Sequence, residues 1–260
     1  MIEERRVSEV WANHQYKILE RDLNTTITEE SIREAYYKTP NKQDFVKAVR
    51  VLIHYLKERK IILPHIAAEL LDMRILKPVK SKVREVYLTD EEIVEGLNLM
   101  RSKWDDDTVM LYKFLVYTGM RPSHAIRVLR NFDRRELEFR ENVAILPMMK
   151  YVVGEEKRAY VALMPAHFAE ELRPFKIELK ETSWKSRLNP RKWKPPVDSR
   201  IDANAIRKWH MNFLVRNKID SALVNFIQGR SPEDVGSARY LERRERAIEA
   251  YREVVDRFPI

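Results

Sequence analysis

The chain has 260 residues, with 49 Lys plus Arg against 40 Asp plus Glu, so its formal net charge is +9 and a polyanionic partner is favoured. It contains no cysteine, which excludes disulfides, thiolate metal sites and a cysteine nucleophile. No stretch approaches the roughly 18 apolar residues of a membrane span, and the N-terminus lacks a signal-peptide core, so we expect a cytoplasmic protein with no membrane partner.

The first third of the chain is predicted to be helical. Apolar residues recur at helical spacing within 43–60, and Pro64 opens a second apolar helix that runs to about Leu76. The next segment, 77–87, is basic, contains a proline and has no apolar period. We therefore predict a linker there and a domain boundary near residue 84.

The second part of the chain opens with clear helix signals. Thr89 and Glu92 have the spacing of a capping box at a helix N-terminus. Gly119 is placed to end the helix predicted over 108–117 in a left-handed cap. Arg121 is then predicted to begin the next helix, with a proline directly after it in the first turn, where proline is tolerated.

The sequence changes character over 136–165. The runs LEFRENVAILPMM and KRAYVALMP are rich in β-forming residues and are separated by a polar turn with a glycine, which predicts a small antiparallel sheet. Helices are predicted again within 203–229, and a charged last helix over 241–258 carries apolar residues at steps of seven, three and four. The predicted fold class is therefore mainly α with a small antiparallel β-sheet (α+β), in two domains over 1–84 and 85–260.

The segment WKSRLNPRKWKPP, at 184–196, is dense in Lys, Arg, Trp and Pro. It is predicted to be an exposed loop, in which cations hold phosphates and the tryptophans present flat faces to sugars or bases. In the alternative interpretation, its tryptophans cover the edge of the domain. The side chains that we expect to bind nucleic acid are Lys185, Arg187, Arg191, Lys192 and Lys194 of this segment, with Lys157 and Lys208 outside it.

Several polar residues occur in an order that resembles a known family. The segment YTGMRPSHAIRVL is similar to the TGLRxSE box of tyrosine recombinases, NAIRK to their HxLRH box, IQGR to a helix ending in LGH, and ARYLE to the element with their tyrosine nucleophile. The resemblance covers roughly 85–260, and its departures look like those of archaeal virus and plasmid integrases. The residues at the family's catalytic positions are Arg121, Lys150, Asn204, Arg207, Arg230 and Tyr240.

The resemblance implies a site-specific recombinase that acts on double-stranded DNA together with other copies of itself, in a tetrameric synapse. A helical, core-binding-like domain over 1–84 and the catalytic domain would close around the DNA. Tyr240 would attack the phosphate, while Arg121 and Arg207 would stabilise the developing charge without a metal ion, a nucleotide or another cofactor. Lys150 would protonate the leaving 5′ oxygen.

Three positions depart from the family pattern. His124 stands where the family has the Glu that orients its first arginine, and Arg230 replaces a His or Trp, adding a third guanidinium. Asn204 replaces a His and cannot accept a proton, so Lys208, His210 and water are the candidates to take the role of that histidine.

Several alternatives remain open from the sequence. Lys157, across the polar turn, competes with Lys150. Tyr240 is expected to precede the last helix in a mobile context, and Tyr251 and Tyr160 are its structural competitors. The last helix either packs on its own domain or, as we favour, contacts a neighbouring copy on DNA. The same chemistry suits a type IB topoisomerase, and the departures also suit an inactive DNA-binding protein on the same fold.

Overall fold

The computed structural model describes residues 9–77, 87–151, 159–230 and 237–260, with the backbone alone for Val10 and 237–240. The chain divides into two compact units, Met1–Arg84 and Glu85–Ile260, each with its own hydrophobic core. In the described ranges, no helix is long and apolar enough to cross a membrane.

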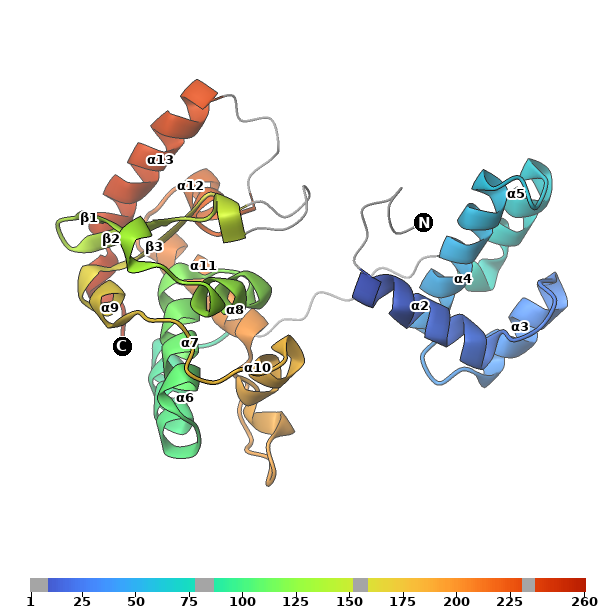
Figure 1. Ribbon diagram of the computed structural model, residues 1–260, viewed down its shortest axis with the longest axis horizontal. Helices are drawn as coiled ribbons and strands as arrows, with labels where there is room; N and C mark the ends of the chain where they lie inside the picture. The colour runs from blue at the N-terminus through green and yellow to red at the C-terminus, as the bar shows by residue number, and fades with distance from the viewer. Residues whose placement is uncertain (1–8, 78–86, 152–158, 231–236) are drawn as a thin grey trace. The chain divides into compact units, whose positions relative to one another are not determined.

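The first unit is a small bundle of helices (Figure 1). They are α2 (Glu9–Asp22), α3 (Glu29–Lys38), α4 (Lys42–Glu58) and α5 (Pro64–Asp72), followed by a 3-10 turn at Arg74–Leu76. Phe45, Val49 and Ile53 share one face of α4 and are fully buried at the centre of this core. The two predicted helices are confirmed, although the second ends before the 3-10 turn, and most of the predicted linker lies outside the described residues.

The second unit begins with three helices, α6 (Asp90–Lys103), α7 (Asp106–Thr118) and α8 (Pro122–Arg130). The capping box is confirmed, because Thr89 N donates to Glu92 Oε2 at 2.8 Å and Glu92 N donates to Thr89 Oγ1 at 3.3 Å. The left-handed cap is also confirmed, since Gly119 ends α7 with φ +57°. Arg121 directly precedes α8, whose first residue is a proline.

A three-stranded antiparallel sheet follows, in the order β1 (Glu138–Arg140), β2 (Val143–Pro147), β3 (Val161–Pro165). In its register, Ile145 of β2 pairs with Glu138 on one side and with Leu163 on the other. Nearly all of β2 and β3 is buried, because helices that precede the sheet in the chain and helices that follow it both contact these strands. The small antiparallel sheet predicted over 136–165 is therefore confirmed.

The remaining helices are α9 (Ala166–Glu171), α10 (Glu181–Arg187), α11 (Ala203–Arg216), α12 (Ser221–Ile227) and α13 (Ser237–Arg252). Helix α7 is buried on nearly all sides and packs against α6, α11 and β3, so it forms the centre of the unit (Figure 1). The predicted fold class, mainly α with a small antiparallel sheet, is confirmed.

The last helix packs against its own unit. Ile248 and Tyr251 of α13, and Phe258 after it, are buried, and Tyr251 Oη donates a hydrogen bond to Tyr117 O at 2.9 Å. Leu241, near the other end of the predicted apolar stripe, is 58% exposed. The structure therefore favours packing on the chain's own domain for most of the stripe, and leaves Leu241 available to a neighbouring copy.

Candidate active site

The ends of two helices build the candidate site. Gly119 ends α7 with φ +57°, and Gly229 follows α12 with φ +65°. A glycine in this conformation turns the chain sharply and leaves the last helix carbonyls free to accept further hydrogen bonds. The turn after α12 is fixed by the Arg230 N–H, which donates to Asn225 O at 2.7 Å. Each turn is followed by an arginine, Arg121 in the first case and Arg230 in the second.

Backbone carbonyls of these turns hold two guanidiniums. Arg207, on α11, is buried and donates from Nη1 to Gly119 O and from Nη2 to Gln228 O, both at 2.8 Å. Arg121 donates from Nη1 to Gly229 O, also at 2.8 Å. Because a carbonyl carries no net charge, these bonds fix the guanidiniums without neutralising them.

The charges of these arginines lie close together. Burial, and then the charges of Arg230 and Arg121, lower the pKa of Arg207 to about 9, so Arg207 is still charged at neutral pH. Burial and then Arg230 also lower the pKa of Arg121, and burial lowers that of Arg230. The fold thus gathers Arg121, Arg207 and Arg230 into one arginine cluster.

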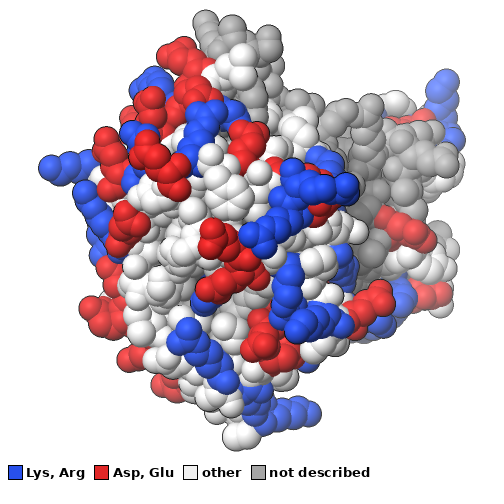
Figure 2. Space-filling model, turned by 60° about the vertical axis from the view of Figure 1, so that its left-hand side comes forward, with Lys and Arg blue, Asp and Glu red and all other residues white. Residues whose placement is uncertain are grey.

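Among the described residues, no Asp or Glu pairs with a guanidinium of the arginine cluster. Other arginines of the same unit do have acidic partners, for example Arg140 with Glu245, Arg173 with Asp107, Arg187 with Asp105, Arg200 with Glu92, Arg216 with Asp90 and Arg252 with Glu141. On the face seen in Figure 2, Lys and Arg are likewise interspersed with Asp and Glu. The concentration of positive charge at the arginine cluster is therefore a local feature.

The structure does not bring Lys150 into the arginine cluster. Its ammonium forms an ion pair with Glu136 and lies 4.9 Å from the centre of the Tyr151 ring. The Tyr151 hydroxyl donates to Glu136 Oε2 at 2.7 Å and lies 3.4 Å from Asn131 O, at the C-terminal end of α8, whereas Arg121 precedes the N-terminal end of that helix. The nine residues of α8 span about 14 Å. Lys150 and Arg121 therefore lie at opposite ends of this helix.

The candidates for the polar position beside Arg207 differ in exposure. Asn204 is exposed on the first turn of α11, and Lys208 is half-buried next to Arg207. His210 is fully buried, and burial lowers its pKa to about 3, so it cannot exchange protons with a substrate as a surface histidine would. His124 is also buried, on α8. Asn204 and Lys208 thus remain the candidates.

Tyr240 lies in the first turn of α13, rather than before the helix as predicted. The structure describes its backbone, and its side chain lies outside the described residues. Its two competitors contribute to packing instead, because Tyr251 is fully buried and the Tyr160 ring stacks on Phe226 with centroids 5.6 Å apart. Tyr240 therefore remains the candidate nucleophile.

The basic segment 184–196 is not the exposed loop that we predicted. Helix α10 covers its first residues, and both Trp184 and Trp193 are buried. Trp184 stacks on Phe175 with ring centroids 4.2 Å apart, and Trp193 packs edge-on against Trp104 at 5.9 Å. The alternative, in which the tryptophans cover the edge of the domain, is correct, because large aromatic faces gain free energy when packing removes them from water.

Several cations of the basic segment have acidic partners, which are Asp105 for Arg187, Glu181 for Lys185 and Asp202 for Arg191. Arg187 in addition lies over the rings of Trp104 and Trp184, so its guanidinium is part of the packing. Lys192 and Lys194 are exposed. Lys157 lies outside the described residues.

The sequence reasoning missed Gln228. Its Nε2 donates to Arg207 O at 2.9 Å while its own backbone O accepts from Arg207 Nη2. It directly precedes the helix-ending Gly229, but nothing in the sequence distinguishes it from a solvated polar residue at a helix end. Its role follows only from the contact between α11 and α12.

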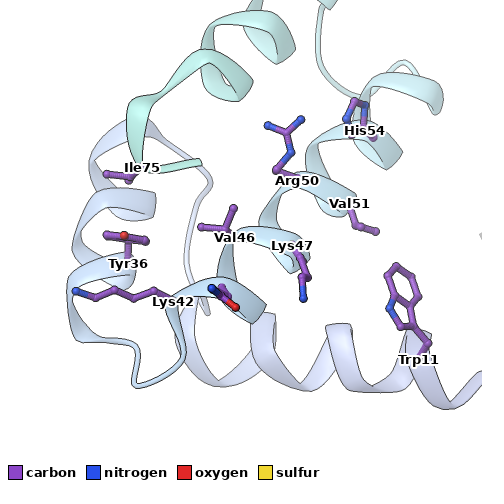
Figure 3. A pocket seen from close by; sticks show the side chains of 10 residues that line it. Trp11, Tyr36, Lys42, Val46, Lys47, Arg50, Val51, His54 and Ile75 are labelled. Carbon is purple, nitrogen blue, oxygen red and sulfur yellow. The ribbon is translucent and has the colours of Figure 1, made fainter. Parts of the chain in front are cut away.

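The first unit contains a separate cavity of about 340 Å³ between α2, α3 and α4. Figure 3 shows Trp11 at one end and Tyr36 with Lys42 at the other, with Val46 between them. The lining residues include two lysines and an arginine, and none is acidic. One of these cations, Lys47, pairs with Asp44 at 3.4 Å.

The fold and the arginine cluster define the class of protein. The chain has the fold of tyrosine recombinases. A lambda integrase dimer bound to a COC′ core site is 13% identical, with 90% of this chain and 92% of that chain covered and a TM-score of 0.58. XerH site-specific recombinase bound to its difH substrate is 14% identical, with 89% and 88% covered and a TM-score of 0.48. No curated protein matches the chain.

A family model described as archaeal phage integrase matches residues 85–257, which is well over half of the chain. The chain therefore belongs to the archaeal phage integrase family. The resemblance to tyrosine recombinases that the sequence predicted, including the archaeal branch, is confirmed. The match begins where the second unit begins, so the helices of the first unit lie outside it.

Proposed function

We propose that this integrase cleaves and rejoins DNA strands at a specific site through a covalent bond between Tyr240 and a 3′ phosphate. The observation that carries the proposal is the arginine cluster, in which the guanidiniums repel one another and those of Arg121 and Arg207 are held by carbonyls rather than by carboxylates. A phosphodiester supplies the negative charge that this arrangement lacks, and paired guanidinium donors match its non-bridging oxygens.

The reaction follows from these groups. The Tyr240 oxygen attacks phosphorus, the bond from phosphorus to the 5′ oxygen breaks, and the phenol loses a proton while the 5′ oxygen gains one. Arg121, Arg207 and Arg230 stabilise the charge that spreads over the non-bridging oxygens in the transition state. Attack by another 5′-hydroxyl on the phosphotyrosine reverses the step and joins a new pair of strands.

The acid that protonates the 5′ oxygen is a lysine between β2 and β3. Lys150 must leave Glu136 and move along α8 to reach the arginine cluster, because the two lie at opposite ends of that helix. Lys157 lies further along the same connection, outside the described residues. We therefore propose Lys157 ahead of Lys150 as the acid, because the ion pair with Glu136 holds Lys150 away from the arginine cluster.

The DNA partner also fits the remaining charges. Lys192 and Lys194 are exposed on the second unit, and Lys42 and Arg50 line the cavity of the first. Each contact with a phosphate releases counterions, so we expect affinity to fall steeply with salt. The lambda integrase relative is a dimer on its core site, and we propose that this chain likewise acts as several copies on double-stranded DNA.

A trapping experiment tests the proposal. Duplexes of randomised sequence that carry nicks are incubated with the chain, because a short strand released from the cleaved side diffuses away and the covalent adduct accumulates. The adduct is isolated under denaturing conditions and its DNA is sequenced. We expect wild type and Tyr87→Phe, an exposed tyrosine in the same unit, to give adducts and Tyr240→Phe to give none.

The alternatives predict other results. No adduct with wild type would favour the inactive DNA-binding protein, and an undiminished adduct with Tyr240→Phe would show that the nucleophile is another residue. If the recovered duplexes share no sequence and the chain relaxes plasmid DNA without joining two duplexes, the type IB topoisomerase is correct. A shared sequence and joined duplexes support the recombinase.

A further inference from the structure

A buried imidazole and a buried primary amide lie directly behind the arginine cluster. His210, on α11, is fully buried, and Gln228, after α12, is 1% exposed. Gln228 Nε2 lies 2.9 Å from His210 Nδ1 and 2.9 Å from Arg207 O. The amide, which follows α12, thus contacts two residues of α11, the imidazole of His210 and the backbone of Arg207.

The partners fix the hydrogens of this pair. His210 Nε2 lies 3.0 Å from Tyr117 O, and a carbonyl only accepts, so Nε2 carries the hydrogen and Nδ1 offers a lone pair. Arg207 O also only accepts, so the nitrogen of the Gln228 amide must face it, and the same nitrogen donates to Nδ1. Both hydrogen bonds of the amide nitrogen are therefore made in one orientation, in which Gln228 Oε1 has no partner among the described residues, and both are lost if the amide turns over.

Tight packing holds the pair in place. The Phe258 ring stacks on His210 with centroids 6.0 Å apart. A Cβ on Gly119 would lie 2.2 Å from His210 Nδ1 and 2.8 Å from Gln228 Nε2. The pair therefore packs so closely against Gly119 that no side chain fits between them. Small displacements of this pair must therefore be transmitted to the turns that surround it.

We propose that His210 and Gln228 form a positioning pair that sets where the guanidiniums of Arg207 and Arg121 lie. The Gln228 side chain is anchored to Arg207 O, while the Gln228 backbone O receives Arg207 Nη2 and the next carbonyl, of Gly229, receives Arg121 Nη1. Rotation of this one turn would move the acceptors of both guanidiniums. The pair acts on the phosphate through the arginines and does not touch it.

This inference rests on the proposed function and predicts a separation of rate from affinity. DNA affinity is spread over many phosphate contacts, so the loss of correct geometry at one phosphate changes it little. Stabilisation of the transition state depends on donors that are already placed where charge develops. Removal of the pair is therefore expected to slow cleavage while DNA binding stays nearly unchanged.

The test compares Gln228→Leu with Asn217→Leu, a matched control. Asn217 is half-buried and directly follows α11, at the end of the helix that is distant from Arg207. Its side-chain amide donates to Phe213 O at 2.9 Å. Single-turnover adduct formation on a nicked duplex, DNA affinity and thermal unfolding are measured for both. We expect Gln228→Leu to slow cleavage about 10- to 100-fold, the range typical for lost orienting partners, with affinity within about 3-fold. The control is expected to lose stability and keep the rate.

Other outcomes overturn the inference. A folded Gln228→Leu that cleaves at the wild-type rate contradicts it, and so does an equal loss of rate in Asn217→Leu at matched stability. Should Gln228→Leu fail to fold, His210→Phe keeps the bulk and removes the acceptor, and an unchanged rate in that variant would contradict the positioning role.

A second measurement separates this inference from the proposed function. In spectra of chain labelled with 15N-arginine, slowly exchanging guanidinium hydrogens of Arg207 should be seen in wild type and in Asn217→Leu, and lost in Gln228→Leu. If wild type forms no adduct, the proposed function fails while these spectra still decide on the positioning pair. Retention of the slow hydrogens in Gln228→Leu would refute the pair.

Discussion

The arginine cluster and the basic segment 184–196 are both rich in cations, but the cations of the two regions have different partners. In the basic segment, Arg187, Lys185 and Arg191 meet carboxylates, and the tryptophans between them are buried. In the arginine cluster, guanidiniums meet backbone carbonyls and one another. Cations are denser in the sequence of the basic segment, but the arginine cluster holds the charge that a phosphate can use.

The physical difference lies in the partner. A carboxylate neutralises a guanidinium, so a phosphate would have to displace it at the cost of a lost ion pair. Two positive charges about 4 Å apart repel by about 4 kcal/mol at an effective dielectric constant near 20, and this repulsion is relieved when an anion binds. The carbonyls at Gly119, Gln228 and Gly229 hold the charges in place until that happens.

The largest expected effect follows from Arg207. Arg207→Lys keeps one positive charge but cannot bond Gly119 O and Gln228 O together, because an ammonium lacks the planar fork. We expect cleavage of a nicked duplex to fall about 100- to 1000-fold, about 3 to 4 kcal/mol of transition-state stabilisation. Single-turnover kinetics measure this loss. A fall of less than about 10-fold would mean that the cluster is a structural feature like the paired arginines.

The matching change in the basic segment should affect stability instead. Arg187 pairs with Asp105, donates to Thr108 Oγ1 at 2.9 Å and lies 4.6 Å from the centre of the Trp104 ring. Arg187→Gln leaves a half-buried carboxylate without its partner, so we expect the free energy of unfolding to fall by about 2 kcal/mol. Denaturant melts measure it. Cleavage by the folded fraction should be unchanged, and a large loss of rate with normal stability would break the comparison.

The sequence predicts those parts of the fold that depend on neighbouring residues. The capping box at Thr89, the left-handed Gly119 and the antiparallel sheet are local signals, and all are confirmed. The prediction of an exposed loop over the basic segment is wrong because its tryptophans are buried by residues outside the segment. Trp184 packs on Phe175, and Trp193 packs on Trp104, which is distant in the chain. Spacing alone contains no information about such partners.

The same limit applies to the candidate site. The order of the motifs in the sequence predicts Arg121, Arg207 and Arg230, and the fold brings these three arginines together. This part of the site is predictable because glycines in the sequence mark the two helix ends that precede Arg121 and Arg230. The pairing of Lys150 with Glu136 and the role of Gln228 arise from tertiary contacts. Neither could be derived from motifs.

A third prediction concerns the neutral groups behind the arginine cluster. Burial lowers the pKa of His210 to about 3, below the value near 6.5 of an exposed imidazole. Between these values the unfolded chain takes up a proton that the folded chain does not, so stability falls as the pH falls through about 6.5. We expect His210→Phe to lack this loss and to gain about 2 kcal/mol on wild type between about pH 7 and about pH 5.

Urea melts of both proteins at the two pH values check this expectation. An equal pH dependence in the two would mean that His210 is not held neutral. His210 would then carry a further positive charge behind the arginines. The groups behind the arginine cluster would no longer be neutral, and the comparison with the carboxylate partners of the basic segment would not hold.

The smallest expected effect tests what the basic segment retains for DNA. Lys192 and Lys194 are exposed, whereas Lys185 pairs with Glu181. If exposed lysines contact phosphates, Lys192→Gln and Lys194→Gln should each reduce the slope of log affinity against log salt by about 0.9. Lys185→Gln should change the slope less, because that lysine is already neutralised by its partner. Fluorescence anisotropy over a salt series measures the slopes, and a larger change for Lys185 would show that acidic partners do not predict which cations bind DNA.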